Sequence, residues 1–267
     1  MHTDQLESVL EELYGRLNRR EFVHPDPLEF LYRYPYVADR EVAALVASSL
    51  AYGNVRQILR SVSSVLERMP VPHRFLSRST RDSLLMTFAG FKHRFTTGAE
   101  LGLMLYGAKL AIERFGSLAA CFNAGLSPDH QTIVPALAAF VRELAQVFNG
   151  KPRSLLPSPD AGSACKRLNL FLRWMVRKDD VDPGGWDNVD PALLVVPLDV
   201  HMHRICMRLG LTTRKQANLK AAHEVTRAFR SIAPHDPVRY DFALTRLGIR
   251  DDMDPRAFLD RCSRRRK

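Results

Sequence analysis

The stretch SPDAGSACKRLNLFLRWMVRK, residues 158–178, indicates both the fold class and a candidate site. Pro159 and Gly162, with Pro157 just before the stretch, predict a turn, and Ser163 is the expected N-cap of the helix that follows. Apolar side chains then recur at helical spacing, at Cys165, Leu168, Phe171, Leu172 and Met175. The stretch therefore predicts an amphipathic helix with Lys166 in its first turn.

Lys166 is an unusual residue for the first turn of a helix. The N-terminus of a helix carries partial positive charge, so acidic side chains are the usual choice there. That field, with Arg173 and Arg177 on the same helical face, would favour the neutral amine of Lys166. A neutral lysine is a nucleophile, so Lys166 is either a catalytic residue or an ordinary surface lysine.

Helical spacing also dominates the rest of the chain. After Asp39, the expected N-cap, Val42, Leu45, Val46 and Ser49 follow the i, i+3, i+4, i+7 pattern, and similar stripes cover 55–69, 133–148 and 205–209. Only 193–196 is β-like, and a run that short does not build a sheet. The sequence predicts an all-α fold of about a dozen helices.

The composition excludes several classes of protein. Of the 267 residues 46% are hydrophobic, which suffices for one large domain or for two lobes around a cleft. No apolar run has the length of a membrane helix, and the acidic start does not resemble a signal peptide. The four cysteines lack metal-binding spacing. We expect a soluble cytoplasmic protein with no metal and no cofactor.

The charge balance favours a polyanionic partner. The chain has 39 Lys and Arg against 29 Asp and Glu, a net charge of +10. Basic side chains that neutralise phosphates release counterions, so nucleic acid is the expected partner. A basic protein without a nucleic-acid role is the alternative.

A second stretch, VVPLDVHMHRICMRLGL, covers residues 195–211. Pro197 ends an extended approach, and Asp199 is the expected N-cap of a short helix at 200–209. Capping alone would explain this aspartate.

The segment around Asp199 resembles the helix–hairpin–helix DNA glycosylase superfamily (HhH-GPD). It is most similar to the 8-oxoguanine branch, whose version also reads Val-Pro, then Asp-Val-His-Met. The resemblance implies that Lys166 attacks the sugar C1′ and forms a Schiff base. It also implies that Asp199 assists departure of the base and stabilises the cationic sugar, and that His201 contacts a DNA phosphate. The separation of Lys166 and Asp199 is close to that in the archaeal 8-oxoguanine glycosylases.

Two further patches resemble the same superfamily. Residues 48–58, SSLAYGNVRQI, resemble the helix–turn–helix whose turn fills the space left by the flipped base. Tyr52 and Asn54 would form this wedge, although an ordinary helix break at Gly53 is the alternative. Arg56 and Arg173 complete the predicted DNA contacts.

The last of the patches, YDFAL at 240–244, begins what we expect to be the last long helix. In the superfamily a helix in this position lines the base pocket. Asp241 would accept hydrogen bonds from a guanine-like base, and Phe242 would stack on that base or belong to the core.

The resemblance implies a two-lobed, all-helical fold with its active site in the cleft between the lobes. Residues 1–267 would form one catalytic unit, with 38–178 as the central lobe and 1–37 packed with 190–267 as the second. The expected activity is that of a monomeric, nucleoid-associated glycosylase with AP lyase activity on an oxidised purine such as 8-oxoguanine. The whole chain also resembles an uncharacterised bacterial family, through DPLEFLYRYP, SLAYGNVRQI, CKRLNLFLRWMVRKDD and PLDVHMHRICMRLGL.

Two other interpretations stay open. The usual glycosylase hairpin reads Leu-Pro-Gly-Val-Gly, whereas this chain has Asp-Ala-Gly-Ser at 160–163. This change favours a non-catalytic protein of the same fold that binds damaged or branched DNA. The third interpretation is a small-molecule enzyme in which Asp199, His201 and His203 hold a metal, although alternate residues of one helix point in different directions.

Overall fold

The computed structural model describes residues 3–150, 155–249 and 255–263, and these are mostly helical. The basic tail at 264–267 lies outside the described residues. The α-helices are α1 Thr3–Leu17, α2 Val37–Ser49, α3 Val55–Leu66, α4 Pro72–Arg78, α5 Arg81–Thr87, α6 Gly98–Phe115, α7 Leu118–Asn123, α8 Val134–Ala145, α9 Lys166–Val176, α10 Val200–Arg208, α11 Leu219–Arg230, α12 Asp241–Ile249 and α13 Pro255–Ser263. Short 3₁₀ helices are η1 Arg20–Phe22, η2 Pro27–Arg33, η3 Pro159–Ala161 and η4 Pro191–Leu193.

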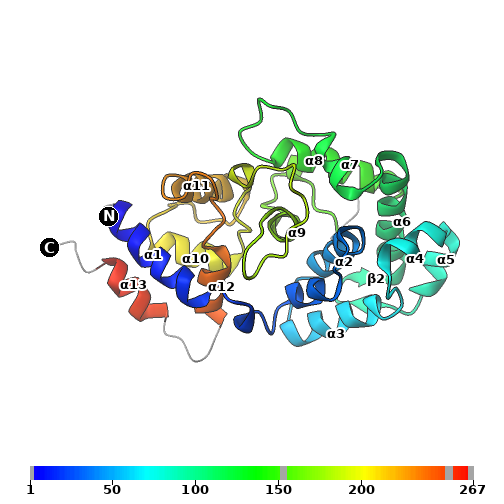
Figure 1. The fold of residues 1–267 in the computed structure, drawn as a ribbon, viewed down its shortest axis with the longest axis horizontal. Helices are drawn as coiled ribbons and strands as arrows, with labels where there is room; N and C mark the ends of the chain where they lie inside the picture. The colour runs from blue at the N-terminus through cyan, green and yellow to red at the C-terminus, as the bar shows by residue number, and fades with distance from the viewer. Residues whose placement is uncertain (1–2, 151–154, 250–254, 264–267) are drawn as a thin grey trace.

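Two groups of helices lie on either side of α9 (Figure 1). In one group α1 packs against α12 and α13, and α10 packs against α12, so the two ends of the chain lie together. In the other group α6 packs against α4, α5, α7 and α8. Helix α2 packs against α9, and η2 packs against α2 and α3. Segments from both ends and from the middle of the chain therefore surround the start of α9.

The predicted helical stripes form helices, and the β-like run does not form a strand. The stripes at 55–69 and 133–148 contain α3 and α8. Residues 194–196 are extended without a partner strand. Within the described residues the only sheet is a hairpin, which the sequence did not predict, in which β1 (Lys92–His93) pairs antiparallel with β2 (Thr96–Thr97). None of the described helices is long and apolar enough to span a bilayer.

Two predicted helix starts are wrong, that of α2 by three residues and that of α9 by two. Helix α2 begins at Val37, so Asp39 lies inside its first turn and accepts a hydrogen bond from the backbone N–H of His73 instead of capping its own helix. At α9 the N-cap position belongs to Cys165 rather than Ser163. Ser163 Oγ accepts a hydrogen bond from the Cys165 N–H, at 3.2 Å, which closes a turn just before the helix.

Cys165 has a backbone conformation that side chains rarely adopt. Its φ is 46°, in the left-handed region, which is unfavourable for a residue with a Cβ atom. The surrounding contacts hold it there: Asn169 Nδ2 donates to the Ala164 carbonyl at 2.9 Å, and the Cys165 side chain is buried. This left-handed residue occupies the N-cap position directly before Lys166, which is the first residue of α9.

A buried carboxylate joins three elements of the core. Glu41 in α2 accepts hydrogen bonds from the backbone N–H groups of Leu118 and Ala119, at the start of α7, and from Trp186 Nε1. The Trp186 ring packs edge-on against Phe171 of α9, with ring centroids 5.0 Å apart. Glu41 and Trp186 therefore connect α2, α7 and α9 in the core.

Candidate functional site

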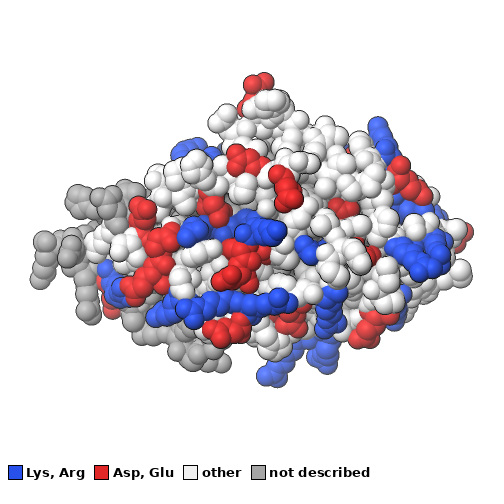
Figure 2. Space-filling model, in the orientation of Figure 1, with Lys and Arg blue, Asp and Glu red and all other residues white. Residues whose placement is uncertain are grey.

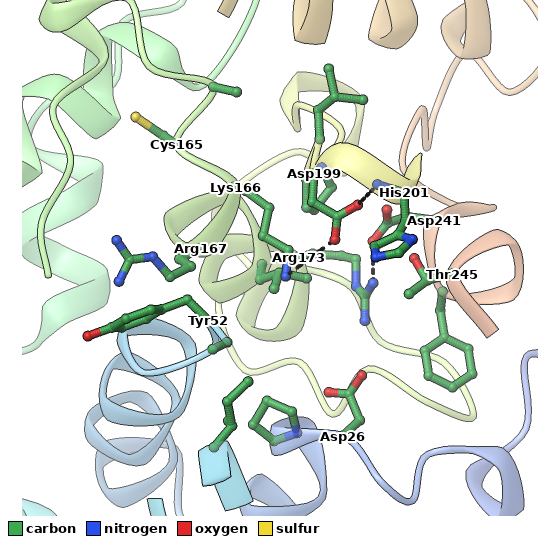
Figure 3. A pocket seen from close by; sticks show the side chains of 18 of the residues that line it. Asp26, Tyr52, Cys165, Lys166, Arg167, Arg173, Asp199, His201, Asp241 and Thr245 are labelled. Carbon is green, nitrogen blue, oxygen red and sulfur yellow. Dashed lines mark hydrogen bonds and ion pairs between the residues drawn. The ribbon is translucent and has the colours of Figure 1, made fainter. Parts of the chain in front are cut away.

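A cleft of about 650 Å³ opens at the start of α9. It is lined by the start of α9, the loop before α10, the turn before α3, the start of η2 and the first turns of α12. Figure 3 shows the labelled side chains from these segments lying around one space. They include Asp26, Tyr52, Cys165, Lys166, Arg167, Arg173, Asp199, His201, Asp241 and Thr245.

Lys166 and Asp199 face each other across this cleft. Lys166 Nζ lies 3.8 Å from Asp199 Oδ2, and the two side chains are 30% and 34% exposed. The other carboxylate oxygen, Oδ1, accepts hydrogen bonds from the backbone N–H groups of His201 and Met202, both at 2.9 Å. Asp199 therefore caps α10 with one oxygen and leaves the other for the lysine, so the capping role and a chemical role are compatible.

Arg173 is almost completely buried at the inner end of the cleft, which does not suit its predicted role in DNA binding. Its side chain is 3% exposed and is held between the carboxylates of Asp182 and Asp241. Arg177 is similarly buried and pairs with Asp182, Asp179 and Asp236. Because carboxylates balance both guanidinium groups, neither arginine is the free cation beside Lys166 that the helical spacing suggested.

Asp241 lines the inner wall of the cleft, where the sequence placed a pocket residue. Burial raises the pKa of its carboxyl group to about 6, and the ion pair with Arg173 opposes this effect. Phe242 next to it is 1% exposed, and the guanidinium carbon of Arg246 lies 4.9 Å from the centre of its ring. Phe242 thus belongs to the wall of the cleft, where a neighbouring cation partly covers the ring.

Sequence reasoning missed Arg246 and its partner Asp26. Arg246 is 3% exposed on α12, and its Nη2 lies 2.5 Å from Asp26 Oδ2, at the N-cap of η2. The pair lines the cleft and joins residues that are 220 positions apart. The only feature of the sequence that pointed to this pair was the DPLEFLYRYP patch at residues 26–35, which begins with Asp26.

The predicted wedge residues lie at the mouth of the cleft. Tyr52 is half-buried; its hydroxyl donates to the His93 carbonyl at 2.8 Å, and Arg167 Cζ lies 4.7 Å from the centre of its ring. Asn54 is exposed and caps α3, because its Oδ1 accepts from the Arg56 N–H at 3.0 Å. The Arg56 side chain is exposed on the first turn of α3.

The two histidines of α10 have different surroundings. His201 is exposed at the rim of the cleft. His203 is buried and its Nε2 lies 2.8 Å from the carbonyl oxygen of Arg214. Asp199, His201 and His203 therefore do not converge, and no group of three metal-ligating side chains occurs among the described residues.

A family model described as "Protein of unknown function (DUF2400)" matches residues 26–250, a range that contains Lys166, Asp199 and Asp241. No curated protein and no solved structure matches the chain.

Proposed function

The chain belongs to the family described as DUF2400, and from its cleft we propose that it is a DNA glycosylase with AP lyase activity. The observation that carries this proposal is the position of Lys166 Nζ, 3.8 Å from Asp199 Oδ2 in a half-open cleft. An amine and a carboxylate at this separation can act on the same sugar.

The reaction would use each of the two groups at the sugar C1′ atom. Cleavage of the bond between C1′ and the base builds positive charge on the sugar, which the Asp199 carboxylate stabilises. Lys166 Nζ forms a new bond to C1′ after it loses a proton, for which Asp199 is a nearby acceptor. The base leaves with the electrons of the broken bond and takes up the proton that Lys166 gave to Asp199. The C1′–O4′ bond of the sugar then breaks, O4′ takes a second proton from the nitrogen, and a protonated Schiff base between Nζ and C1′ remains. This covalent intermediate divides one difficult step into easier ones.

The dimensions of the cleft suit a flipped nucleotide. Pockets for small ligands measure roughly 300–1,000 Å³, and this one measures about 650 Å³. Asp241 on its inner wall offers carboxylate oxygens to the N1–H and amine of a guanine-like base. We infer an oxidised purine, with 8-oxoguanine as the first substrate to test.

DNA is the partner that the charge distribution favours. On the face shown in Figure 2, basic side chains gather along the lower edge, near the place of α3 in Figure 1. The exposed residues of α3 include Arg56 and Arg60. With His201 at the rim, these cations would contact the phosphates that flank the flipped nucleotide.

The proposal includes the two-lobed arrangement of the HhH-GPD glycosylases. The cleft takes Tyr52 and Lys166 from the range 38–178 and Asp26, Asp199 and Asp241 from the ranges 1–37 and 190–267. A cleft built from both predicted lobes supports this division, with the whole chain acting as one monomeric unit.

The alternative is a non-catalytic DNA-binding protein of the same fold. The altered hairpin favours it: the N–H of Gly162 donates to the Pro159 carbonyl at 2.8 Å, within the turn itself. The proximity of Lys166 to Asp199 favours catalysis instead, because it brings an amine and a carboxylate within reach of a single sugar.

Base release from oligonucleotides tests the proposal. Duplexes that carry 8-oxoguanine opposite each of the four bases would be incubated with the protein, and free base and cleaved strand would be measured separately. We expect release of the oxidised base followed by strand cleavage. Binding without either product would support the non-catalytic alternative.

A further inference from the structure

An exposed aromatic ring stands at the tip of the β1–β2 hairpin. Lys92 pairs with Thr97 and His93 with Thr96, so Arg94 and Phe95 form the turn. Phe95 is 73% exposed. Arg94 has a φ of 53°, in the left-handed region that is unfavourable for residues with a side chain. A two-residue hairpin turn requires a positive φ, and this turn presents an aromatic ring to the solvent.

The hairpin is fastened to the turn at the mouth of the cleft. His93 is fully buried, and its ring nitrogens lie 2.9 Å from Ser61 Oγ and 3.1 Å from the Tyr52 carbonyl oxygen. In return, Tyr52 donates its hydroxyl proton to the His93 carbonyl. These bonds join the hairpin to α3 and to the cleft, so Phe95 has a fixed position relative to Lys166.

Arg94 neighbours both the turn at Gly53 and the ring of Phe95. A Cβ atom on Gly53, which lines the cleft, would lie 2.8 Å from both Cδ and Nη1 of Arg94. On its other side, Arg94 Cζ lies 5.4 Å from the centre of the Phe95 ring. Arg94 therefore contacts both Gly53, which lines the cleft, and the aromatic ring of Phe95. Lys92 adds a second exposed cation to the hairpin.

We propose that this hairpin is a second DNA contact, in which Phe95 stacks on an unpaired base beside the cleft. Arg94 and Lys92 would neutralise the neighbouring phosphates. Aromatic rings stack on every base through their π faces, and nearby cations add phosphate contacts. The hairpin would thus increase the affinity for DNA that contains an unpaired base. It would not discriminate between lesions. This inference rests on the proposed function, because it assumes that the substrate bound in the cleft is DNA.

The test measures binding to a duplex that carries an abasic-site analogue beside one unpaired 2-aminopurine. Phe95→Ala and Phe95→Leu should weaken binding by roughly 5- to 100-fold in an anisotropy titration, whereas Phe95→Tyr should stay within about twofold of wild type. Stacking on the ring should quench the fluorescence of 2-aminopurine in the complexes with wild type and Phe95→Tyr. The complexes with Phe95→Ala and Phe95→Leu should not show this quenching. Met86→Ala is the matched control, because Met86 on α5 is also 73% exposed.

The inference would be overturned if Phe95→Ala bound the duplex and quenched the fluorescence as well as wild type does. It would also be overturned if the wild-type protein did not bind the duplex. Single-turnover base release at saturating protein separates it from the proposed function. The hairpin contact predicts a normal saturating rate for Phe95→Ala. If affinity depends on Phe95 but wild type releases no base from any lesion, the hairpin contact stands and the glycosylase proposal fails.

Discussion

Substitution of Asp199 separates its role as a helix cap from its role in chemistry. Asp199→Asn keeps an oxygen that can accept from His201 and Met202, as Oδ1 does now at 2.9 Å. It removes the negative charge 3.8 Å from Lys166 Nζ. Asp199→Ala removes both the cap and the charge.

The expected magnitudes follow from these contacts. Loss of a cap costs about 0.5–2 kcal/mol, and a partly exposed ion pair contributes at most about 1 kcal/mol. Together these terms amount to about 0.5–3 kcal/mol, so Asp199→Ala should lower the Tm by roughly 1–12 °C, and Asp199→Asn by less. Loss of the charge that stabilises the cationic sugar should slow base release about 100-fold or more in both variants.

The assay combines thermal unfolding with single-turnover base release. Thr80→Ala is the control for capping, because Thr80 Oγ1 accepts from the Ser83 N–H at the start of α5. The Thr80→Ala variant should lose stability as Asp199→Ala does, but it should release the base at the wild-type rate. If Asp199→Asn released base at the wild-type rate, the carboxylate would be a cap and nothing more.

Three further predictions concern DNA binding and the buried charges. Affinity for duplex DNA should fall steeply as salt rises from about 50 to about 200 mM, because phosphate contacts release counterions; an anisotropy titration without salt dependence would exclude such contacts. The raised pKa of Asp241, about 6, means that the folded protein holds this proton more tightly than the unfolded chain. Relative to Asp241→Asn, wild type should therefore lose up to about 3 kcal/mol of stability as pH rises from about 4 to about 6; a pH-independent difference in urea unfolding would contradict this. Arg173→Met should cost about 3–5 kcal/mol, since Asp182 and Asp241 each lose a buried partner, and a urea midpoint equal to wild type would show that the ion pairs do not hold the fold.

The sequence predicted the helices well because apolar spacing reports the buried face of each helix directly. It also placed Lys166 in the first turn of its helix and Asp199 at the cap of another, as the structure does. It misplaced the cap of α9 because the left-handed conformation of Cys165 depends on contacts formed only after folding.

Contacts between distant residues were beyond the reach of sequence patterns. Arg173 looked like a surface cation, yet its partner Asp241 lies 68 positions away and buries it. Strands of two residues are too short to show alternation, so the β1–β2 hairpin gave no signal. The two lobes, the substrate and the catalytic roles stay predictions.

The central claim is that Lys166 forms a covalent bond to the sugar C1′ of a damaged nucleotide. Borohydride reduction in the presence of a duplex carrying 8-oxoguanine should leave protein and DNA joined, and peptide mapping should locate the bond at Lys166. Lys166→Gln should bind DNA without forming this adduct. Lys178→Gln, an exposed lysine just after α9, should form the adduct as wild type does. An adduct formed by Lys166→Gln at the wild-type rate would contradict the claim.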